Sequence, residues 1–164
     1  MQQAGRIAAA IEVLETIQSQ HRPATAALKD WGNAHRFAGS GDRAAIGNLV
    51  FDALRQKASL ASFMDNDSAR AAVIGLLHRS WGMTADEISA LFSGENHAPV
   101  TLTQTERDSI VKESQPDLSE WIAGDYPEWL HPSFQRAFGA EAAKEGAAMA
   151  LRAPIDLRAN LLKQ

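Results

Sequence analysis

The chain has 164 residues, of which 45% are hydrophobic and 22% charged, an ordinary composition for one globular domain with its own core. It contains no cysteine, which excludes disulfides, a thiol nucleophile and a cysteine-based zinc site. No apolar run of about 18 residues and no N-terminal signal pattern is present, so the sequence predicts a cytoplasmic protein without a membrane span.

The formal net charge of -4 is distributed unevenly along the chain. Residues 1–82 and 129–164 each carry two more basic than acidic residues, whereas residues 83–128 carry ten acidic residues against two basic ones. A protein coated for nucleic acid on every face would be basic throughout. If nucleic acid is a partner, we expect the contact on the first half. The alternative is that each segment has a solvated charged face.

Apolar residues recur at helical spacing through the first half of the chain and predict helices over 4–19, 24–36, 42–64 and 68–81. The third of these has the widest apolar stripe, which favours a central position. Pro23 precedes the second helix, and the Gly-Ser-Gly run 39–41 interrupts the chain before the third. Either Ser40 or Asp42 is suited to cap that third helix.

The second half predicts shorter elements. Two capping boxes, Thr84 with Glu87 and Thr103 with Glu106, open helices over 84–93 and 103–113. A short turn near 118–122, a helix over 132–138 and an alanine-rich helix over 140–152 follow. Residues 155–160 alternate apolar and polar and predict one strand. Because a lone strand leaves its backbone groups unpaired, we expect the natural polypeptide to continue beyond it.

No complete catalytic constellation is present. The chain has no glycine-rich dinucleotide or phosphate loop of the usual form, and its five histidines lack the spacing of metal ligands. We therefore expect this chain alone not to be an enzyme and to hold neither cofactor nor metal. Its tryptophans are expected to anchor the core rather than to stack on bases, and only for Trp31, beside a glycine and near basic residues, does the stacking alternative stay open. The other three are Trp81, Trp121 and Trp129.

The best functional signal is a set of cationic and hydrogen-bonding side chains around the predicted helix ends. Lysine and arginine clusters and helix N-termini are the groups that meet phosphate. The candidates for RNA contact are Arg22, Lys29, His35, Arg36, Ser40, Arg43, Arg55 and Lys57. The alternative interpretation is that Arg43 pairs with an acid such as Asp30 or Asp52 and lies over apolar surface.

The run Asp-Arg-Ala-Ala-Ile-x-Asn-Leu-Val-Phe-x-Ala-Leu-Arg over 42–55 resembles the helix-opening motif of NusB-like RNA-binding domains. A longer set of strings, in the same order, is similar to the N-terminal part of the RsmB/NOP-type (Fmu, Sun) S-adenosylmethionine-dependent rRNA cytosine-C5 methyltransferases, in their alphaproteobacterial form. These strings cover 22–24, 28–32, 35–43, 127–130 and 157–163.

The resemblance implies an all-α fold: a NusB-like antiparallel helical bundle over residues 1–95, an acidic helical linker over 96–126, and over 127–164 the truncated start of a small connecting domain. This last part would be a helical connector that ends in the one strand. The implied function is to bind small-subunit rRNA and position it for the protein's own C-terminal methyltransferase domain. That domain lies outside this chain and would hold S-adenosylmethionine and the catalytic cysteines.

Two alternatives stay open: a free-standing NusB-like RNA- and protein-binding factor, and a structural docking module without RNA contact. Neither a membrane nor a metal is an expected partner.

Overall fold

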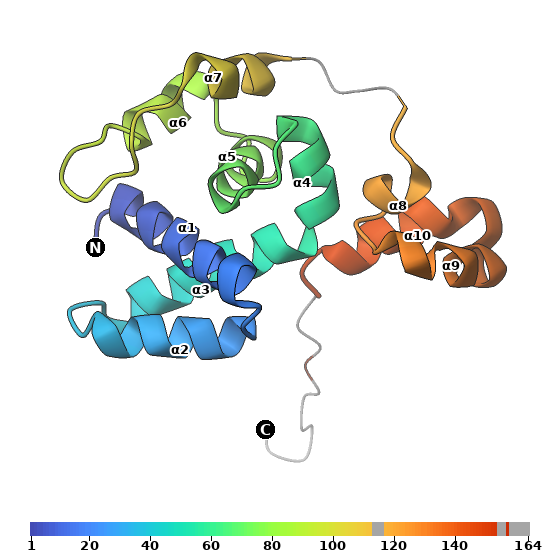
Figure 1. The fold of residues 1–164 in the computed structure, drawn as a ribbon, viewed down its shortest axis with the longest axis horizontal. Helices are drawn as coiled ribbons and strands as arrows, with labels where there is room; N and C mark the ends of the chain where they lie inside the picture. The colour runs from blue at the N-terminus through green and yellow to red at the C-terminus, as the bar shows by residue number, and fades with distance from the viewer. Residues whose placement is uncertain (113–116, 154–156, 158–164) are drawn as a thin grey trace, which may run out of the picture.

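The computed structural model describes residues 1–112, 117–153 and 157, and this part of the chain is all-helical (Figure 1). The helices are α1 (Gln3–Gln20), α2 (Ala24–Ala34), α3 (Ser40–Arg55), α4 (Lys57–Met64), α5 (Ala69–Arg79), α6 (Ala85–Leu91), α7 (Gln104–Val111), α8 (Glu120–Ala123), α9 (His131–Phe138) and α10 (Ala142–Ala150). The prediction of a helical bundle is confirmed. The predicted strand over 155–160 falls almost wholly outside the described residues, and Leu157, the one described residue in it, has no regular secondary structure.

The bundle is formed by α1–α7, and α5 is its most deeply buried helix. Every residue from Ala69 to Leu77 except Arg70 is buried. Helix α1 packs against α2, α3 and α5, while α4 and α7 cover the other side of α5. The central helix is therefore α5 rather than the 42–64 segment. The reason is side-chain size: alanines and a glycine on α5 let neighbouring helices approach it from several directions.

The prediction of one helix over 42–64 is wrong, because the chain breaks at Gln56 into α3 and α4. The break leaves the first backbone N–H groups of α4 without partners inside the helix. Asp125, far along the chain, supplies one: its carboxylate accepts hydrogen bonds from the Ser59 backbone N–H at 2.8 Å and from the Ser59 hydroxyl at 2.7 Å. Burial raises the pKa of Asp125, although these two hydrogen bonds oppose the rise. A distant carboxylate thus caps a helix that local periodicity could not separate from α3.

Two of the four tryptophans depart from the expectation that they anchor the core. Trp81 is 43% exposed and Trp129 is 77% exposed, whereas Trp31 is only 8% exposed. Trp81 follows the end of α5, so the helical stripe on which it was placed no longer holds there. Trp129 lies in a 3-10 turn, Glu128–Leu130, where the period of an α-helix does not apply.

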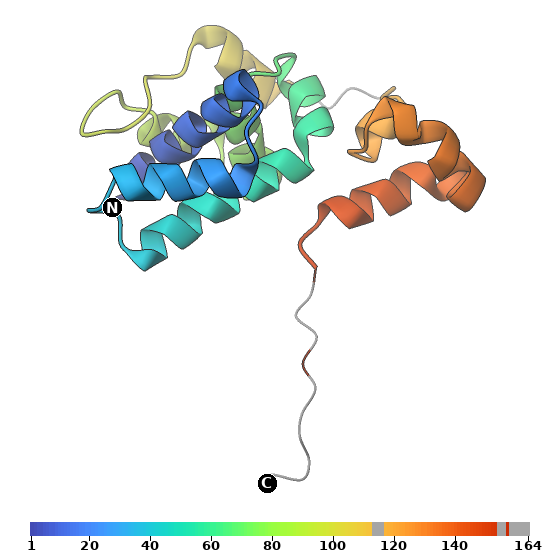
Figure 2. The same cartoon turned by 60° about the horizontal axis from the view of Figure 1, so that its bottom comes forward.

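The helices α8, α9 and α10 form a small unit beside the bundle (Figure 2). Two glycines let α10 cross the end of α8 closely. A Cβ atom at Gly146 would lie 2.6 Å from the Gly124 carbonyl oxygen and 2.5 Å from the Tyr126 ring. Tyr126 is buried in this contact and stacks on Phe134, with their ring centroids 4.1 Å apart. The unit therefore depends on the absence of a side chain at the crossing.

The segment over 96–126, predicted as an acidic linker, contributes to both parts. Leu102 and Ile110 are buried in the hydrophobic core of the bundle, while Asp125 and Tyr126 belong to the packing of α8. Among its described acidic residues, Asp108, Asp117 and Glu120 are exposed, whereas Glu106 and Asp125 are half-buried. The proposed domain boundaries at 95 and 126 stay a prediction.

Arg70 ties the loop before α7 to the bundle. Its guanidinium donates to Glu106 at 2.6 Å and to the Val100 and Thr101 carbonyls at 2.9 and 3.1 Å, and it lies 4.9 Å from the centroid of the Phe92 ring. The capping box of α7 predicted from the sequence is confirmed, because Glu106 also accepts from the Thr103 backbone N–H. One side chain of α5 therefore holds a whole surface segment.

We predict an acid-dependent loss of stability from Glu106. Burial alone would raise the pKa of Glu106, but the hydrogen bonds from Arg70 and Thr103 outweigh it and lower the pKa below its ordinary value near 4.5. Because the folded pKa is the lower one, ionised Glu106 stabilises the fold above that ordinary value, and the contribution is lost as the pH falls through the lowered pKa. Urea unfolding should show wild type more stable than Glu106→Gln at neutral pH, with a gap that closes in acid. A gap independent of pH would contradict the prediction.

Candidate nucleic-acid interface

The turn between α2 and α3 begins at a fixed helix end. The His35 ring stacks on Trp31, with ring centroids 4.2 Å apart, and its Nδ1 lies 2.9 Å from the Trp31 carbonyl oxygen. The Trp31 indole N–H donates in turn to Glu12 of α1 at 2.9 Å. The end of α2 is therefore held against α1 by three groups in contact: the Glu12 carboxylate, the Trp31 indole and the His35 imidazole.

Arg43 holds the turn from its other side. It lies in the first turn of α3 and donates from Nε to the Ala38 carbonyl at 2.9 Å and from Nη2 to the Gly32 carbonyl at 2.7 Å. The guanidinium lies close over Gly32, where a Cβ atom would be 3.2 Å from Nη1, so a larger residue there would push the guanidinium aside by a few tenths of an ångström. Neither acid of the alternative interpretation is its partner: Asp30 pairs with Arg22, and Asp52 pairs with Arg55 and Arg152.

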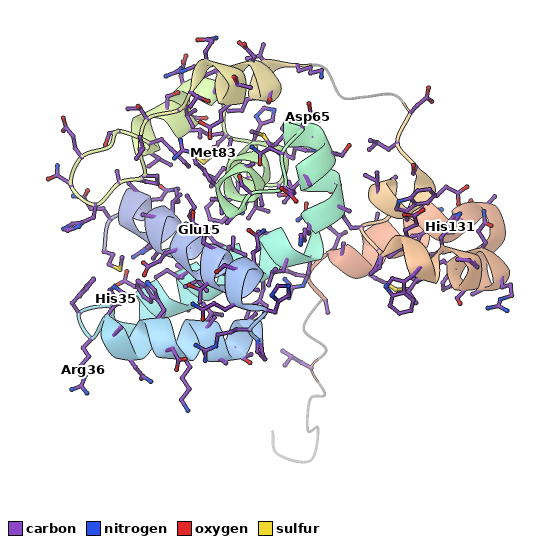
Figure 3. All side chains as sticks on the ribbon, viewed as in Figure 1. Glu15, His35, Arg36, Asp65, Met83 and His131 are labelled. Carbon is purple, nitrogen blue, oxygen red and sulfur yellow. The ribbon has the colours of Figure 1, made fainter. Side chains whose placement is uncertain are left out.

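Between these two supports the chain exposes a cation and an aromatic ring. Figure 3 shows Arg36 pointing away from the bundle at the turn that follows His35. Phe37, the next residue, is 72% exposed, and its ring meets the His35 ring edge-on at 5.7 Å. No ion pair joins Arg36 to another residue within the part of the chain that the structure describes. The turn thus presents an accessible positive charge beside an apolar surface.

The structure brings together half of the side chains that the sequence singled out. The four at this turn are His35, Arg36, Ser40 and Arg43. Arg22, just before α2, pairs with Asp30 within that helix, and Lys29 is exposed on the same helix. Arg55 lies at the far end of α3, about 18 Å along its axis from Arg43, and Lys57 begins α4 just beyond it. Arg22, Lys29, Arg55 and Lys57 therefore do not gather at the α2–α3 turn. Only an extended ligand could contact both the turn and the end of α3.

A cleft beside the turn was missed by sequence reasoning. It has a volume of about 870 Å³ and lies between the first half of α1, the turn, and the loop at Asn96–Ala98. Asn96 and His97 both have left-handed backbone angles, φ 49° and 67°, in that loop. No local signal in the sequence connects residues near 97 with residues near 35, since only the packing of α1 against both brings them together.

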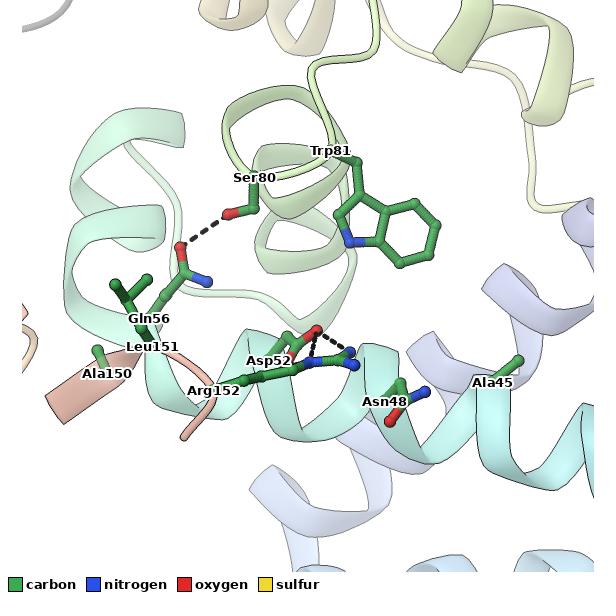
Figure 4. Close-up of a pocket in the computed structure, with 9 residues that line it drawn as sticks. All are labelled: Ala45, Asn48, Asp52, Gln56, Ser80, Trp81, Ala150, Leu151 and Arg152. Carbon is green, nitrogen blue, oxygen red and sulfur yellow. Dashed lines mark hydrogen bonds and ion pairs between the residues drawn. The ribbon is translucent and has the colours of Figure 1, made fainter. Parts of the chain in front are cut away.

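A second hollow lies between α3, the turn after α5 and the end of α10, and its volume is about 490 Å³ (Figure 4). Its floor holds Asp52, a buried carboxylate that pairs with Arg55 at 2.9 Å and also with Arg152. Ser80 donates to Gln56 at 2.8 Å on its rim. Two guanidinium groups neutralise the carboxylate, so this hollow is an anchor for the end of α10 rather than an acid-base site.

In the described ranges 1–112 and 117–153, no three histidine, aspartate or glutamate side chains converge as metal ligands. None of the described helices combines the length and the apolar character needed to cross a membrane. Comparison with protein-family models, with curated proteins and with solved structures finds no match in any of the three. What the turn itself offers chemically is an exposed cation, Arg36, that can meet phosphate, and an exposed aromatic ring, Phe37, on which a planar partner can stack.

Proposed function

We propose that the chain is an RNA-binding domain, the N-terminal part of an S-adenosylmethionine-dependent rRNA cytosine-C5 methyltransferase, and that it positions small-subunit rRNA for a catalytic domain outside this chain. The all-helical bundle agrees with the NusB-like fold that the sequence resemblance implies. The turn between α2 and α3 supplies the contact. In this role the chain performs no chemistry and holds no cofactor of its own.

The observation that carries the proposal is the pair Arg36 and Phe37, held exposed on a backbone supported from both sides. The pair places an exposed aromatic ring, on which a base can stack, directly beside a cation, which can meet the phosphate of the same nucleotide. The stack of Trp31 and His35 on one side and the hydrogen bonds of Arg43 on the other keep the loop in place before a ligand arrives. Such preorganisation lowers the entropy lost on binding.

Charge reversal at Arg36 tests the proposal. In Arg36→Glu the affinity for a single-stranded segment of small-subunit rRNA should fall about tenfold at low salt, because a phosphate contact is replaced by repulsion. The slope of log affinity against log salt should become shallower by about one phosphate contact. Fluorescence anisotropy at several salt concentrations measures both quantities. The thermal midpoint should not change, since Arg36 is exposed and makes no described ion pair.

The matched control is Lys112→Glu, the same change of charge at an exposed position at the end of α7. It lowers the net charge equally but lies away from the turn, so it should reduce affinity far less. Equal losses in the two variants would show that only net charge matters. No RNA binding by the wild-type chain at low salt would contradict the proposed function.

A structural docking module is the second candidate function. The unit of α8–α10 has three large apolar side chains at its surface: Trp129, Met149 and Leu151. Several exposed apolar side chains on one small unit are typical of a protein-binding surface. This surface favours a protein partner such as a further domain. The salt-dependent RNA measurement separates the two functions, because a docking module would show no RNA affinity that falls with salt.

A further inference from the structure

The cleft beside the α2–α3 turn has the size and lining of a binding site. Its volume of about 870 Å³ falls within the range of about 300–1,000 Å³ in which proteins hold small ligands. One wall comes from α1, where Gly5, Ala8 and Ala9 keep the surface low. The opposite rim is the loop over 94–99. Two backbone hydrogen bonds close this loop: the Gly94 N–H donates to the Pro99 carbonyl at 2.9 Å, and the Ala98 N–H donates to the Glu95 carbonyl at 2.8 Å.

Three aromatic rings form the wall on the side of the turn. The indole of Trp31 and the imidazole of His35 are nearly parallel, with an interplanar angle of 15°, and Phe37 continues the row at 87° to His35. The row runs from a buried ring at its inner end to a largely exposed ring at its outer end. Stacking of a base on an aromatic side chain is worth about 1–3 kcal/mol and needs no particular sequence.

The charges divide the site into two zones. Glu12 is the acidic group among the lining residues, and the ammonium of Met1, which also lines the cleft, is already paired with Asp42 at 3.1 Å, so an anionic phosphate is disfavoured inside. Arg36 lies next to Phe37 on the turn and points away from the bundle (Figure 3), so a phosphate is favoured there. A nucleotide satisfies both zones when its base enters the cleft and its phosphate stays beside Arg36.

We infer that this cleft takes one unstacked nucleobase of single-stranded RNA, which stacks on the exposed ring of Phe37, while the stacked pair Trp31 and His35 supports that ring from the inner side. The inference rests on the proposed function and adds to it the form of the RNA. A base within a duplex is stacked on both faces and cannot enter, so the site selects unpaired RNA.

Glu12 adds a preference among the bases. One of its carboxylate oxygens accepts the Trp31 indole N–H at 2.9 Å, and a carboxylate offers about four acceptor positions in all. The remaining positions suit the exocyclic amino group of cytosine, as carboxylates accept from cytosine N4 in other recognition sites. Uracil presents a carbonyl oxygen at the same position, which a carboxylate repels. The cleft therefore prefers cytosine over uracil, two bases of equal size.

Removal of the outer ring tests base entry. In Phe37→Ala we expect the affinity of the full chain for single-stranded RNA to fall about tenfold. Affinity for a duplex of the same length should stay unchanged, because duplex binding uses phosphate contacts alone. The matched control is Trp129→Ala, which removes an equally exposed ring from the α8–α10 unit and should change neither affinity. The thermal midpoints of both variants serve as the check of folding.

Two outcomes would overturn different claims. If wild type binds RNA with a steep salt dependence but Phe37→Ala keeps its preference for single strands, the base site is wrong and the proposed function stands. If wild type binds no RNA, both are wrong.

Affinities for oligocytidine and oligouridine test the role of Glu12. We expect wild type to bind oligocytidine several-fold more tightly than oligouridine, and we expect Glu12→Gln to reduce the ratio of the two affinities. Equal affinities in wild type would remove the Glu12 contact.

Discussion

Replacing Arg43 with lysine is expected to lower the free energy of unfolding by about 2 kcal/mol, although the positive charge is kept. The guanidinium spans the carbonyls of Gly32 and Ala38 with two donors in a fixed fork. The ammonium of lysine is a compact group on a flexible stem and satisfies one of these carbonyls at a time. Thermal unfolding followed by circular dichroism should show a midpoint lower by about 4–8 °C for a chain of this size.

The control for this prediction is Arg36→Lys, the same substitution at the exposed side of the same turn. It should leave the thermal midpoint unchanged, because Arg36 is exposed and no described ion pair uses its guanidinium. At temperatures below the unfolding midpoint, neither lysine variant should change RNA affinity much, because lysine keeps the positive charge that attracts the phosphates. If Arg43→Lys unfolds at the wild-type temperature, the hydrogen bonds of Arg43 contribute nothing to stability and its role is limited to its charge.

Replacing Gly146 with alanine is expected to cost about 3 kcal/mol and to disrupt the packing of the α8–α10 unit. The new methyl group would overlap the Gly124 carbonyl oxygen and the ring of Tyr126, at 2.6 and 2.5 Å from the Cβ position. Tyr126 is buried and stacked on Phe134, so it has little room to withdraw. We expect α10 to separate from α8, with increased tryptic cleavage within 117–153 and a shift in tryptophan fluorescence from Trp121 and Trp129.

Gly47→Ala provides the matched control in the middle of α3, where the nearest atom to the new Cβ is a Leu28 methyl at an ordinary 4.0 Å. Alanine has the higher helix propensity, so this variant should be about 0.5–1 kcal/mol more stable than wild type. Equal behaviour of the two variants would mean that the α8–α10 crossing is looser than the structure has it.

The helices whose signals are local agree best with their predictions. The boundaries of α1 and α2 differ from the predicted ones by one or two residues, and the capping boxes at Thr84 and Thr103 form as predicted. A capping box depends on residues only three positions apart, so its hydrogen bonds form wherever the helix does. For these helices, existence and type therefore followed from periodicity and caps alone.

The break at Gln56 shows where such reasoning fails. The apolar stripe continues from α3 into α4, so no local pattern marks the boundary, and the cap comes from Asp125 across the molecule. The two exposed tryptophans fail for a related reason: a stripe extrapolated past a helix end no longer describes which side chains face the core. At Gln56 a long-range contact outweighs the local preference, whereas at the two tryptophans the α-helical period no longer applies.

The candidate interface divides in the same way. Sequence reasoning placed His35, Arg36, Ser40 and Arg43 at one turn because they are neighbours along the chain. It could not determine that Arg43 hydrogen-bonds to backbone carbonyls, that Arg22 and Arg55 pair with acids, or that the loop near His97 closes a cleft beside Trp31. Hydrogen-bond partners and cavities depend on distances between segments far apart in sequence.

By itself, then, the sequence determined the all-helical class, most helix spans, the capped helix starts and the position of the basic turn, since each depends on residues within a turn or two of one another. The tertiary structure alone decided which helix is central, where the long apolar segment breaks, which cations stay accessible, and that a cleft lined by aromatic rings adjoins the turn. Those features depend on how α1 packs against α2, α3 and α5, and on how Asp125 and Arg152 join the α8–α10 unit to the bundle.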